Sequence, residues 1–312
     1  MRIAVTGANG FVGSTLCSLL EATGHDVVAL GRYRHGHGPG DILLLDDVSG
    51  LTNCFNGADA VIHLAARAHV IEDRAEDRLL EFRRINVEGT RNVAAAAVLA
   101  GVGRFVFASS IGVLGNTTGA GAFSETSLPA PVEPYAISKW EAEQLLREVE
   151  QRTGLELVVV RPVLVYGPRA RGNFQRLLQL VAAERPLPLG SVRNKRSFLG
   201  VANLAELLLR CVVEPAAAGK VFVAADGDIS TPDLLQVLAT AMGRRCRVFP
   251  FPLLPLSLGA ALVGKRAEFL RMTGNLQVDS SFARGVLGWS PRKSLIDGMS
   301  EMADWYAGLR RP

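Results

Sequence analysis

The chain has 312 residues, of which 48% are hydrophobic and 21% are charged, and its formal net charge at pH 7 is +4. This composition is typical of a globular protein with one large domain or two fused domains. Lysine and arginine are dispersed and form no basic stripe with interleaved aromatic residues, so we expect no nucleic-acid partner. The four cysteines lack CxxC or other metal-binding spacing, which indicates reduced thiols, no metal site and a cytoplasmic protein.

No targeting segment is expected, because the N-terminal apolar run is short and ends in a glycine-rich turn. The longest apolar stretch, 249–264, holds three prolines. It is shorter than the ~20 residues that a membrane-spanning helix needs. We therefore expect no integral membrane segment, and we expect a core helix or a substrate lid at 249–264. Weak association of this stretch with a membrane surface stays open as an alternative.

The first expected strand, 2–6, runs into a glycine-rich turn that opens an expected helix over 11–23. In this context the first glycine permits a tight turn, the second lets the backbone approach a pyrophosphate, and the third lets the helix pack close to the strand. The helix N-terminus then faces the phosphates. We expect a dinucleotide to bind here, in contact with Gly7, Asn9, Gly10, Phe11, Val12 and Gly13.

The end of the second expected strand, 26–30, decides which dinucleotide binds. NAD sites place an acidic residue there to accept a hydrogen bond from the ribose 2′-hydroxyl, whereas NADP sites supply a cation. Here the strand is followed by Gly31 and Arg32, so the acid is absent and an arginine is present. A charge-assisted bond from Arg32 to a 2′-phosphate favours NADP(H), and NAD stays possible.

Further strands are expected at 42–45, 60–64, 104–108 and 157–161. They alternate with two long helices, at 77–101 and 134–152, and Gly154 is the expected C-cap of the second helix. Strands that alternate with helices predict an α/β fold, with a doubly wound, Rossmann-like parallel sheet that helices cover on both faces.

A tyrosine and a lysine four residues apart supply proton chemistry on the helix 134–152. Tyr135 and Lys139 lie on the same helix face. The ammonium group and the positive end of a nicotinamide ring are together expected to lower the pKa of the phenol toward neutrality. The strand 104–108 is followed by two serines, of which Ser110 is expected to hydrogen-bond the substrate oxygen whose proton Tyr135 handles. Ser110, Tyr135 and Lys139 are therefore the predicted catalytic residues.

The chain resembles the extended short-chain dehydrogenases/reductases, the NAD-dependent epimerase/dehydratase family, most of which act on nucleotide sugars. The resemblance covers nearly the whole chain. It rests on seven motifs in the order of the family: TGANGFVG (6–13), DAVIHLAA (59–66), NVEGT (86–90), FASSIGVLG (107–115), YAISK (135–139), RPVLVYGP (161–168) and LGWSP (287–291).

This resemblance implies a dinucleotide-binding domain at 1–165, to which strands and a helix from about 196–225 return. It implies a smaller α/β substrate-binding cap at 166–312. Asp47 and Val48 would border the adenine of the cofactor. The full set of further cofactor contacts that the resemblance implies is Asp47, Val48, Leu64, Ala65, Ala66, Tyr135 and Lys139.

The resemblance also implies a UDP-sugar substrate, held by an Asn-Phe pair that opens a cap helix and by two arginines. The matching residues are Asn173, Phe174, Arg196 and Arg271, with Arg266 as the alternative for the last position. Planar guanidinium groups suit a diphosphate. Residues near the sugar are implied at Arg67, His69, Ser109 and Ser110.

The residues that follow the catalytic serine help to distinguish the reactions that members of this family catalyse. Ser110 is followed by Ile111 and Gly112 instead of the Asp-Glu pair of sugar 4,6-dehydratases, so dehydration is not expected. Several stretches resemble bacterial enzymes that reduce UDP-4-keto-6-deoxy-N-acetylglucosamine to UDP-N-acetylquinovosamine for O-antigen and other surface polysaccharides. These stretches are AARAHV (65–70), FRRINVEGT (82–90), PLPLG (186–190) and LQVDSS (276–281).

The expected function is therefore NADP(H)-dependent reduction of a 4-ketosugar. A UDP-hexose 4-epimerase with tightly bound NAD is the first alternative. A non-catalytic NADP(H)-binding protein is the second, although such proteins typically lose the tyrosine or the lysine, and this chain retains Tyr135 and Lys139.

A homodimer through the helices 77–101 and 134–152 is also implied, because related enzymes form a four-helix bundle there. Apolar residues beyond those needed to cover a sheet are expected to make the contact. They are Val93, Ala94, Ala97 and Val98 on the first helix, and Ile137, Trp140, Ala142 and Leu145 on the second.

Overall fold

Seven parallel strands form the large sheet of the protein, in the spatial order β3-β2-β1-β4-β5-β6-β9. The computed structural model describes residues 1–31, 41–42, 45–68, 77–119, 121–170 and 172–309. The strands are β1 (Arg2–Thr6), β2 (Asp26–Gly31), β3 (Asp41–Ile42), β4 (Ala60–His63), β5 (Arg104–Ala108), β6 (Glu156–Pro162) and β9 (Val221–Ala224). Strand order reverses between β1 and β4, which confirms the doubly wound fold and marks the crevice where such sheets bind ligands.

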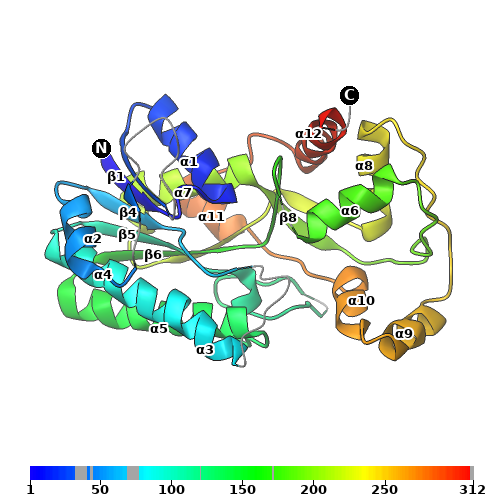
Figure 1. Ribbon diagram of the computed structural model, residues 1–312, viewed down its shortest axis with the longest axis horizontal. Helices are drawn as coiled ribbons and strands as arrows, with labels where there is room; N and C mark the ends of the chain where they lie inside the picture. The colour runs from blue at the N-terminus through cyan, green and yellow to red at the C-terminus, as the bar shows by residue number, and fades with distance from the viewer. Residues whose placement is uncertain (32–40, 43–44, 69–76, 120, 171, 310–312) are drawn as a thin grey trace.

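Helices cover both faces of the large sheet (Figure 1). One face packs against α1 (Phe11–Ala22), α7 (Val201–Val213) and α11 (Ser281–Leu287), and the other against α2 (Val48–Phe55), α4 (Gly89–Leu99) and α5 (Pro134–Thr153). Successive side chains of a strand point to opposite faces. In β1, Ile3 and Val5 accordingly belong to the first core and Ala4 to the second.

A second, three-stranded sheet forms the smaller part of the molecule, at the right of Figure 1. Its strands are β7 (Leu164–Tyr166), β8 (Arg196–Gly200) and β10 (Gly227–Ile229). β8 is parallel to β7 and antiparallel to β10. Its core is completed by α6 (Asn173–Ala182), α8 (Thr231–Ala241) and α12 (Leu295–Gly308), and the chain between α8 and α11 adds α9 (Leu253–Leu262) and α10 (Arg266–Thr273).

Three predicted elements differ from the structure. The expected helix 77–101 is divided into α3 (Arg78–Arg83), a π-helical turn η1 (Arg84–Glu88) and α4. The segment 196–225 was predicted to return to the dinucleotide-binding domain. Its helix α7 packs against the large sheet and its strand β9 belongs to that sheet, whereas β8 pairs with β7 and β10 in the small sheet. The expected strand 42–45 reduces to β3 in the described residues.

Most of the residues that were predicted to contact a second subunit are buried within their own subunit. Five of the eight apolar side chains are buried within the second core, because α4 and α5 pack against each other and the sheet. These five are Val93, Ala94, Ala97, Ala142 and Leu145. Val98, Ile137 and Trp140 are partly exposed, so a contact between subunits rests on these three.

The apolar stretch 249–264 contains α9, and none of the residues of α9 is buried. The prediction of a core helix is therefore wrong here. Leu253 packs against the core of the small part, but Leu254, Leu258 and Leu262 are exposed. No helix in the described part of the chain has the length and apolarity required to cross a membrane.

Candidate functional site

The turn after β1 brings three glycines into close backbone contact. Gly7 has a φ of +73°, and a Cβ there would lie 2.8 Å from the backbone nitrogen of Ala65. A Cβ on Gly13 would lie 2.2 Å from the carbonyl oxygen of Gly7. α1 begins after Gly10, which makes no side-chain cap, so its first backbone N–H groups form a donor site of the kind that binds phosphate. The turn therefore fits a dinucleotide.

The other residues predicted to contact the dinucleotide lie in or beside the same glycine turn. Asn9 and Gly10 are exposed, Phe11 and Val12 are partly exposed, and Gly13 is buried against the strand. After β4, Leu64 donates its backbone N–H to the carbonyl of Thr6 (3.1 Å), and Ala65 donates to the Thr6 hydroxyl (3.3 Å). The loop at 64–66 thus closes the second side of the glycine turn.

His63, at the end of β4, supports this arrangement from the interior. Its Nδ1 lies 2.6 Å from the Thr6 hydroxyl and its Nε2 lies 3.0 Å from the Thr90 hydroxyl. Burial, and secondly the nearby Lys139, lower the pKa of His63 to about 3. The ring is therefore neutral at physiological pH and links the end of β1, through the Thr6 hydroxyl, to the start of α4, through the Thr90 hydroxyl.

The end of β2 carries the predicted cofactor preference. The backbone of Gly31 lies against Asn9, because a Cβ on Gly31 would lie 2.4 Å from the Asn9 side-chain nitrogen. Arg32 lies outside the described residues. Asp47 accepts a hydrogen bond from the backbone of Gly50 (2.8 Å) and caps α2, which begins at Val48. Asp47 thus has a helix-capping role besides its predicted adenine contact.

Tyr135 and Lys139 occupy the first two turns of α5. The ring of Tyr135 meets Phe82 of α3 edge to face, with centroids 6.0 Å apart. The Lys139 side chain is buried, and its Nζ lies 4.3 Å from the centroid of the Phe107 ring in β5. The helix spacing therefore holds both groups near the carboxyl end of β5, beside the loop that follows β4.

Burial changes the proton affinity of both groups. It raises the pKa of Tyr135 to about 12. It lowers the pKa of Lys139 to about 7, against the opposing effect of Glu143. The phenol pKa is therefore raised and not lowered by the protein's own groups, because desolvation dominates and also disfavours the charged form of Lys139. The expected effect of a nicotinamide ring on Tyr135 stays a prediction.

The two serines after β5 face different surroundings. Ser110 is partly exposed, and its Oγ accepts the backbone N–H of Gly112 (3.1 Å) to begin the short helix η2 (Ile111–Val113). Ser109 is buried and donates to Glu143 of α5 (2.5 Å). Glu143 also pairs with the buried Arg161 of β6 (2.6 Å). This network engages the Ser109 hydroxyl in the interior, so of the two predicted sugar contacts only the Ser110 hydroxyl is partly exposed.

A buried asparagine ties the sugar-side loop to the helix of Tyr135. Asn86, in the π-helical turn η1, accepts the backbone N–H of Arg67 (2.8 Å) and donates to the carbonyl of Arg67 (3.1 Å). It also donates to Ser138 (3.0 Å), whose hydroxyl bonds the Tyr135 carbonyl (2.8 Å). Such π-helical turns are frequent at functional sites. Two residues past Arg67, the predicted sugar contact His69 lies outside the described residues.

The two predicted diphosphate arginines meet between β8 and α10. The buried Arg196 donates to the carbonyls of Arg271 and of Gly274 (3.0 Å). Burial, and secondly Arg271, lower the pKa of Arg196 to about 10. The half-exposed Arg271 pairs with Glu133 (2.5 Å), which occupies the N-cap position of α5 two residues before Tyr135 and makes no capping hydrogen bond with its side chain. The small part of the molecule thus reaches the candidate catalytic helix through Arg271.

The predicted Asn-Phe pair opens α6, where Asn173 is the first helical residue. The ring of Phe174 lies between Tyr166 and Phe198, with centroid distances of 6.3 Å and 5.7 Å. Phe198 is two residues from Arg196 on β8, so the aromatic cluster supports the strand that carries this arginine. Arg266, the alternative to Arg271, is the first residue of α10.

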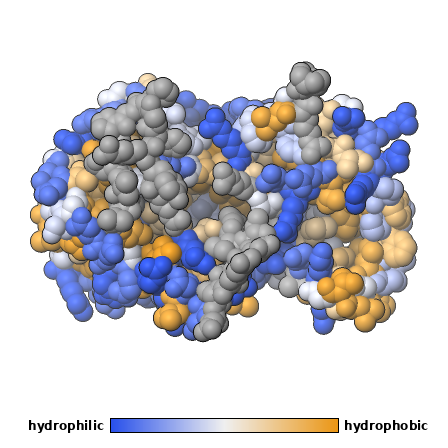
Figure 2. All heavy atoms as spheres, viewed as in Figure 1, coloured by the Kyte–Doolittle hydropathy of each residue, from blue (hydrophilic) through white to orange (hydrophobic). Residues whose placement is uncertain are grey.

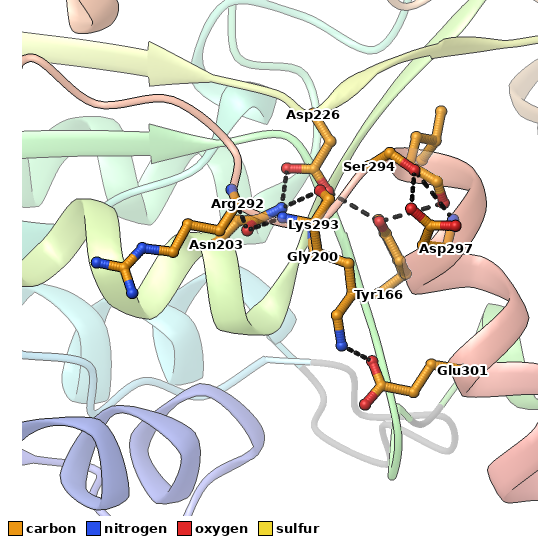
Figure 3. A network of polar contacts seen from close by, with 10 residues as sticks. Tyr166, Gly200, Asn203, Asp226, Arg292, Lys293, Ser294, Asp297 and Glu301 are labelled. Atoms are coloured by element: carbon orange, nitrogen blue, oxygen red, sulfur yellow. Dashed lines mark hydrogen bonds and ion pairs between the residues drawn. The ribbon is translucent and has the colours of Figure 1, made fainter. Parts of the chain in front are cut away.

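A polar network joins the two sheets (Figure 3). The carboxylate of Asp226 accepts hydrogen bonds from the backbone of Gly200 (2.7 Å), the Tyr166 hydroxyl (2.8 Å) and the Asn203 side chain (2.9 Å). Burial, and secondly Asp226, raise the pKa of Tyr166. A pocket of about 370 Å³ opens beside this network, between the start of α1 and α12. The network fixes the small sheet relative to the glycine turn.

Among the residues of this site that were not predicted from the sequence, three are charged. Glu143 and Arg161 form the buried pair beneath α5, and Glu133 receives Arg271. A signal for Glu143 exists, because it stands four residues after Lys139 on the inward face of a helix, where an acid requires a partner. Glu133 has no such local signal, since its partner is 138 residues away.

Comparison with known proteins agrees with the predicted family. A family model described as "NAD dependent epimerase/dehydratase family" matches residues 3–225. The chain is 38% identical to a "UDP-glucose 4-epimerase" of Vibrio cholerae, over 97% of this chain and 95% of that protein. It is 30% identical to the N-acetyl-α-D-glucosaminyl-diphospho-ditrans,octacis-undecaprenol 4-epimerase of Escherichia coli O157:H7, over 83% of this chain and 76% of the relative.

Among solved structures, MoeE5 in complex with UDP-glucose and NAD superposes with a TM-score of 0.80 at 27% identity, and the match covers 99% of both chains. This likeness extends over both the large and the small part of the molecule. The predicted fold and the predicted membership of the epimerase/dehydratase family are therefore confirmed. The finer resemblance to 4-ketosugar reductases stays a prediction.

Proposed function

The chain belongs to the NAD-dependent epimerase/dehydratase family, and from this premise we propose that it is an NADP(H)-dependent reductase of a UDP-4-keto-6-deoxy-N-acetylhexosamine. In this reaction C4 of the ketosugar receives a hydride and its oxygen receives a proton. The nicotinamide cofactor supplies the hydride when it is bound. The residues around α5 supply the proton and orient the ketone.

The observation that carries this proposal is the placement of Tyr135 and Lys139 on one helix, with the partly exposed Ser110 at the adjoining end of β5. Tyr135 acts as the proton donor, and Ser110 orients the C4 oxygen. Lys139 binds the nicotinamide ribose. The raised pKa of Tyr135 supports this direction, because a reductase begins its cycle with the tyrosine protonated.

Two further features support the substrate and the cofactor. Arg196 and Arg271 lie together near the start of α5, so a diphosphate bound to them would extend its sugar toward Tyr135. The second strand ends at Gly31, followed by Arg32 in place of an acid, which supports NADP(H). A homodimer through Val98, Ile137 and Trp140 is part of the same proposal.

A second candidate is a UDP-hexose 4-epimerase with tightly bound NAD. It is favoured by the relative in Vibrio cholerae, which is named a UDP-glucose 4-epimerase, and by MoeE5, whose structure holds UDP-glucose and NAD. An epimerase must first accept the C4 hydroxyl proton, so its tyrosine must start the cycle deprotonated. A third candidate is a non-catalytic NADP(H)-binding protein. In such a protein Tyr135 and Lys139 would have no catalytic role.

The test compares the candidates directly. The purified protein is incubated with UDP-4-keto-6-deoxy-N-acetylglucosamine and NADPH or NADH, and the loss of reduced cofactor and the product stereochemistry are measured. A second incubation holds UDP-glucose without added cofactor. Ketosugar-dependent oxidation of NADPH supports the reductase, whereas interconversion of UDP-glucose and UDP-galactose supports the epimerase. Binding of NADPH without either reaction supports the third candidate.

The cofactor assignment has its own test, the variant Arg32→Ala. It should weaken NADPH binding about tenfold or more, because a charge-assisted bond contributes roughly 1.5 to 3 kcal/mol. NADH binding should change little, since NADH lacks the 2′-phosphate. Arg91→Ala, which alters an exposed arginine on α4, serves as the control. Equal affinity of the unmodified protein for both cofactors would contradict the NADP assignment.

A further inference from the structure

The helix α9 presents an apolar face to the outside of the molecule. Leu254, Leu258 and Leu262 recur every fourth residue and therefore lie on one side of the helix. Their exposed fractions are 73%, 60% and 88%, and Val263 follows at 68%. A leucine stripe of this kind normally faces a core. Here the stripe faces outward, and Figure 2 shows hydrophobic residues gathered at the lower right, where α9 lies in Figure 1.

The charge around this stripe is mostly positive, although the exposed Glu268 of α10 follows Lys265 by three residues. No aspartate or glutamate occurs between Asp233 and Glu268, a segment that carries five basic residues. Lys265 and Arg266 directly follow the stripe and are exposed. The other three are Arg244, Arg245 and Arg247, of which Arg244 lies 3.8 Å from Glu184. We call Leu254, Leu258, Leu262, Val263, Lys265 and Arg266 the α9 surface.

The charge decides between the partners that an exposed apolar helix can have. A second copy that docks through the α9 surface offers Lys265 and Arg266 no opposite charge, because the residues that make up this surface include no acid. A lipid surface with anionic headgroups instead attracts each cation by about 1 kcal/mol and receives the leucines at the same time. Apolar residues beside basic ones are the combination that binds helices to membrane interfaces.

The length of α9 determines whether it could cross a bilayer or only lie along its surface. Its ten residues span about 15 Å, half of the roughly 30 Å hydrocarbon layer. α9 therefore lies along the surface and does not cross it. We propose that the α9 surface binds reversibly to anionic membranes, with Leu254, Leu258 and Leu262 in the headgroup region and Lys265 and Arg266 on the lipid phosphates.

This attachment has a consequence for the candidate site. α10 packs against α9 and carries Arg271, which pairs with Glu133 at the start of α5. The bound membrane would thus lie one helix away from the candidate diphosphate site. The proposal does not depend on which reaction the site performs, because the α9 surface shares no residue with Ser110, Tyr135 or Lys139.

The experiment is vesicle flotation of the full-length protein. Vesicles of phosphatidylcholine alone are compared with vesicles that contain phosphatidylglycerol, at low and at high salt. The variants are Leu258→Glu/Leu262→Glu, which removes the stripe, and Lys265→Glu/Arg266→Glu, which reverses the charge. Leu128→Glu is the matched control, because Leu128 is an equally exposed leucine (85%) on another loop. Circular dichroism verifies that each variant folds.

The unmodified protein and Leu128→Glu should float with the anionic vesicles and lose this binding at high salt. Each double variant should reduce the bound fraction about tenfold, as expected from a loss of roughly 1.4 kcal/mol or more. The proposal is overturned if the unmodified protein stays with the soluble fraction, or if both double variants bind as well as the control. It is also overturned if light scattering without vesicles detects self-association that Leu258→Glu/Leu262→Glu abolishes.

Discussion

Tyr135 retains its proton in the cofactor-free site, and this state determines what its removal should do. Tyr135→Phe removes only the hydroxyl and keeps the ring contact with Phe82. Turnover should therefore fall by about 10² to 10⁴, the usual contribution of a positioned acid or base. NADPH affinity, measured by fluorescence titration, should stay nearly unchanged. Retention of more than about half of the activity would show that another group donates the proton.

Lys139 should make the stability of the protein depend on pH. Its pKa is about 7 in the folded protein and near the ordinary 10.5 when unfolded. Between these values the unfolded chain binds more protons, so stability rises with pH, and the cost of the buried charge is complete below pH 7. Lys139→Met should thus stabilise the cofactor-free protein by at least about 1 kcal/mol at neutral pH.

Urea unfolding at several pH values measures this effect. The gain in the free energy of unfolding from Lys139→Met should shrink as the pH rises from 7 and vanish above 10.5, where lysine is neutral in both states. The same variant should lose cofactor affinity and activity, because Lys139 is proposed to hold the nicotinamide ribose. A stability difference that stays constant with pH would contradict the lowered pKa. Stability exchanged for function in this way is common at active sites.

Helix α5 offers a buried and an exposed ion pair for comparison at the scale of one element. Glu143 pairs with Arg161 in the interior, and Glu141 pairs with Arg83 of α3 at the surface (2.5 Å). Glu143→Gln leaves the buried Arg161 charge without its carboxylate and should destabilise the protein by roughly 3 to 5 kcal/mol. Glu141→Gln should cost about 1 kcal/mol or less, because water solvates its partner.

Thermal and urea unfolding of both variants test this difference. Glu143→Gln should also lower turnover, because Glu143 anchors α5 to Ser109 and β6. A second variant, Glu143→Gln/Arg161→Met, removes both charges and should recover part of the lost stability. If the two single variants destabilise the protein equally, the buried pair has no special role in fixing α5.

The elements that the sequence predicted best are those with strong local signals. The glycine turn and the helix that ends at Gly154, which has a φ of +75°, follow from spacing and from glycine conformation. The π-helical turn at Asn86 could not be predicted in this way. Its cause is tertiary, because the Asn86 side chain bonds Arg67 and Ser138, which come from two other elements. Helical periodicity continues across it without interruption.

At the scale of the whole molecule, the sequence predicted the large sheet. It did not predict that β8 belongs to the small sheet. Five strands of the large sheet form short apolar runs between helices, a pattern that parallel sheets require. β8 has the same apolar character, but its position depends on pairing with β7 and β10. The same limit applies to Arg196 and Arg271, which the family resemblance identified and which only the fold brings together.

The contact between Glu133 and Arg271 links the small part of the molecule to α5, and it would compete with the diphosphate proposed to bind Arg271. Glu133→Gln should free Arg271 and tighten UDP binding by up to about fivefold, as expected from a half-exposed ion pair. Isothermal titration with UDP measures this change. Glu268→Gln, an exposed acid on α10, is the control and should have little effect. Weaker binding to Glu133→Gln would indicate that Glu133 orients Arg271 for the ligand.

The final prediction concerns assembly. Since most apolar residues of α4 and α5 are buried within the subunit, a dimer depends on a small surface that includes Val98, Ile137 and Trp140. A twofold contact repeats each residue on both subunits, so a single Ile137→Glu introduces two charges into it. Light scattering should detect twice the 33.4 kDa chain mass for the unmodified protein and the single mass for Ile137→Glu.

Ile296→Glu is the control for this measurement, because Ile296 is partly exposed (48%) on α12, away from α4 and α5. It should leave the dimer intact. Ile137 lies between Tyr135 and Lys139 in the sequence, so cofactor binding is measured alongside mass to verify that the helix is undisturbed. A mass of 33.4 kDa for the unmodified protein, unchanged with concentration, would refute the dimer and leave the exposed face of α5 to solvent.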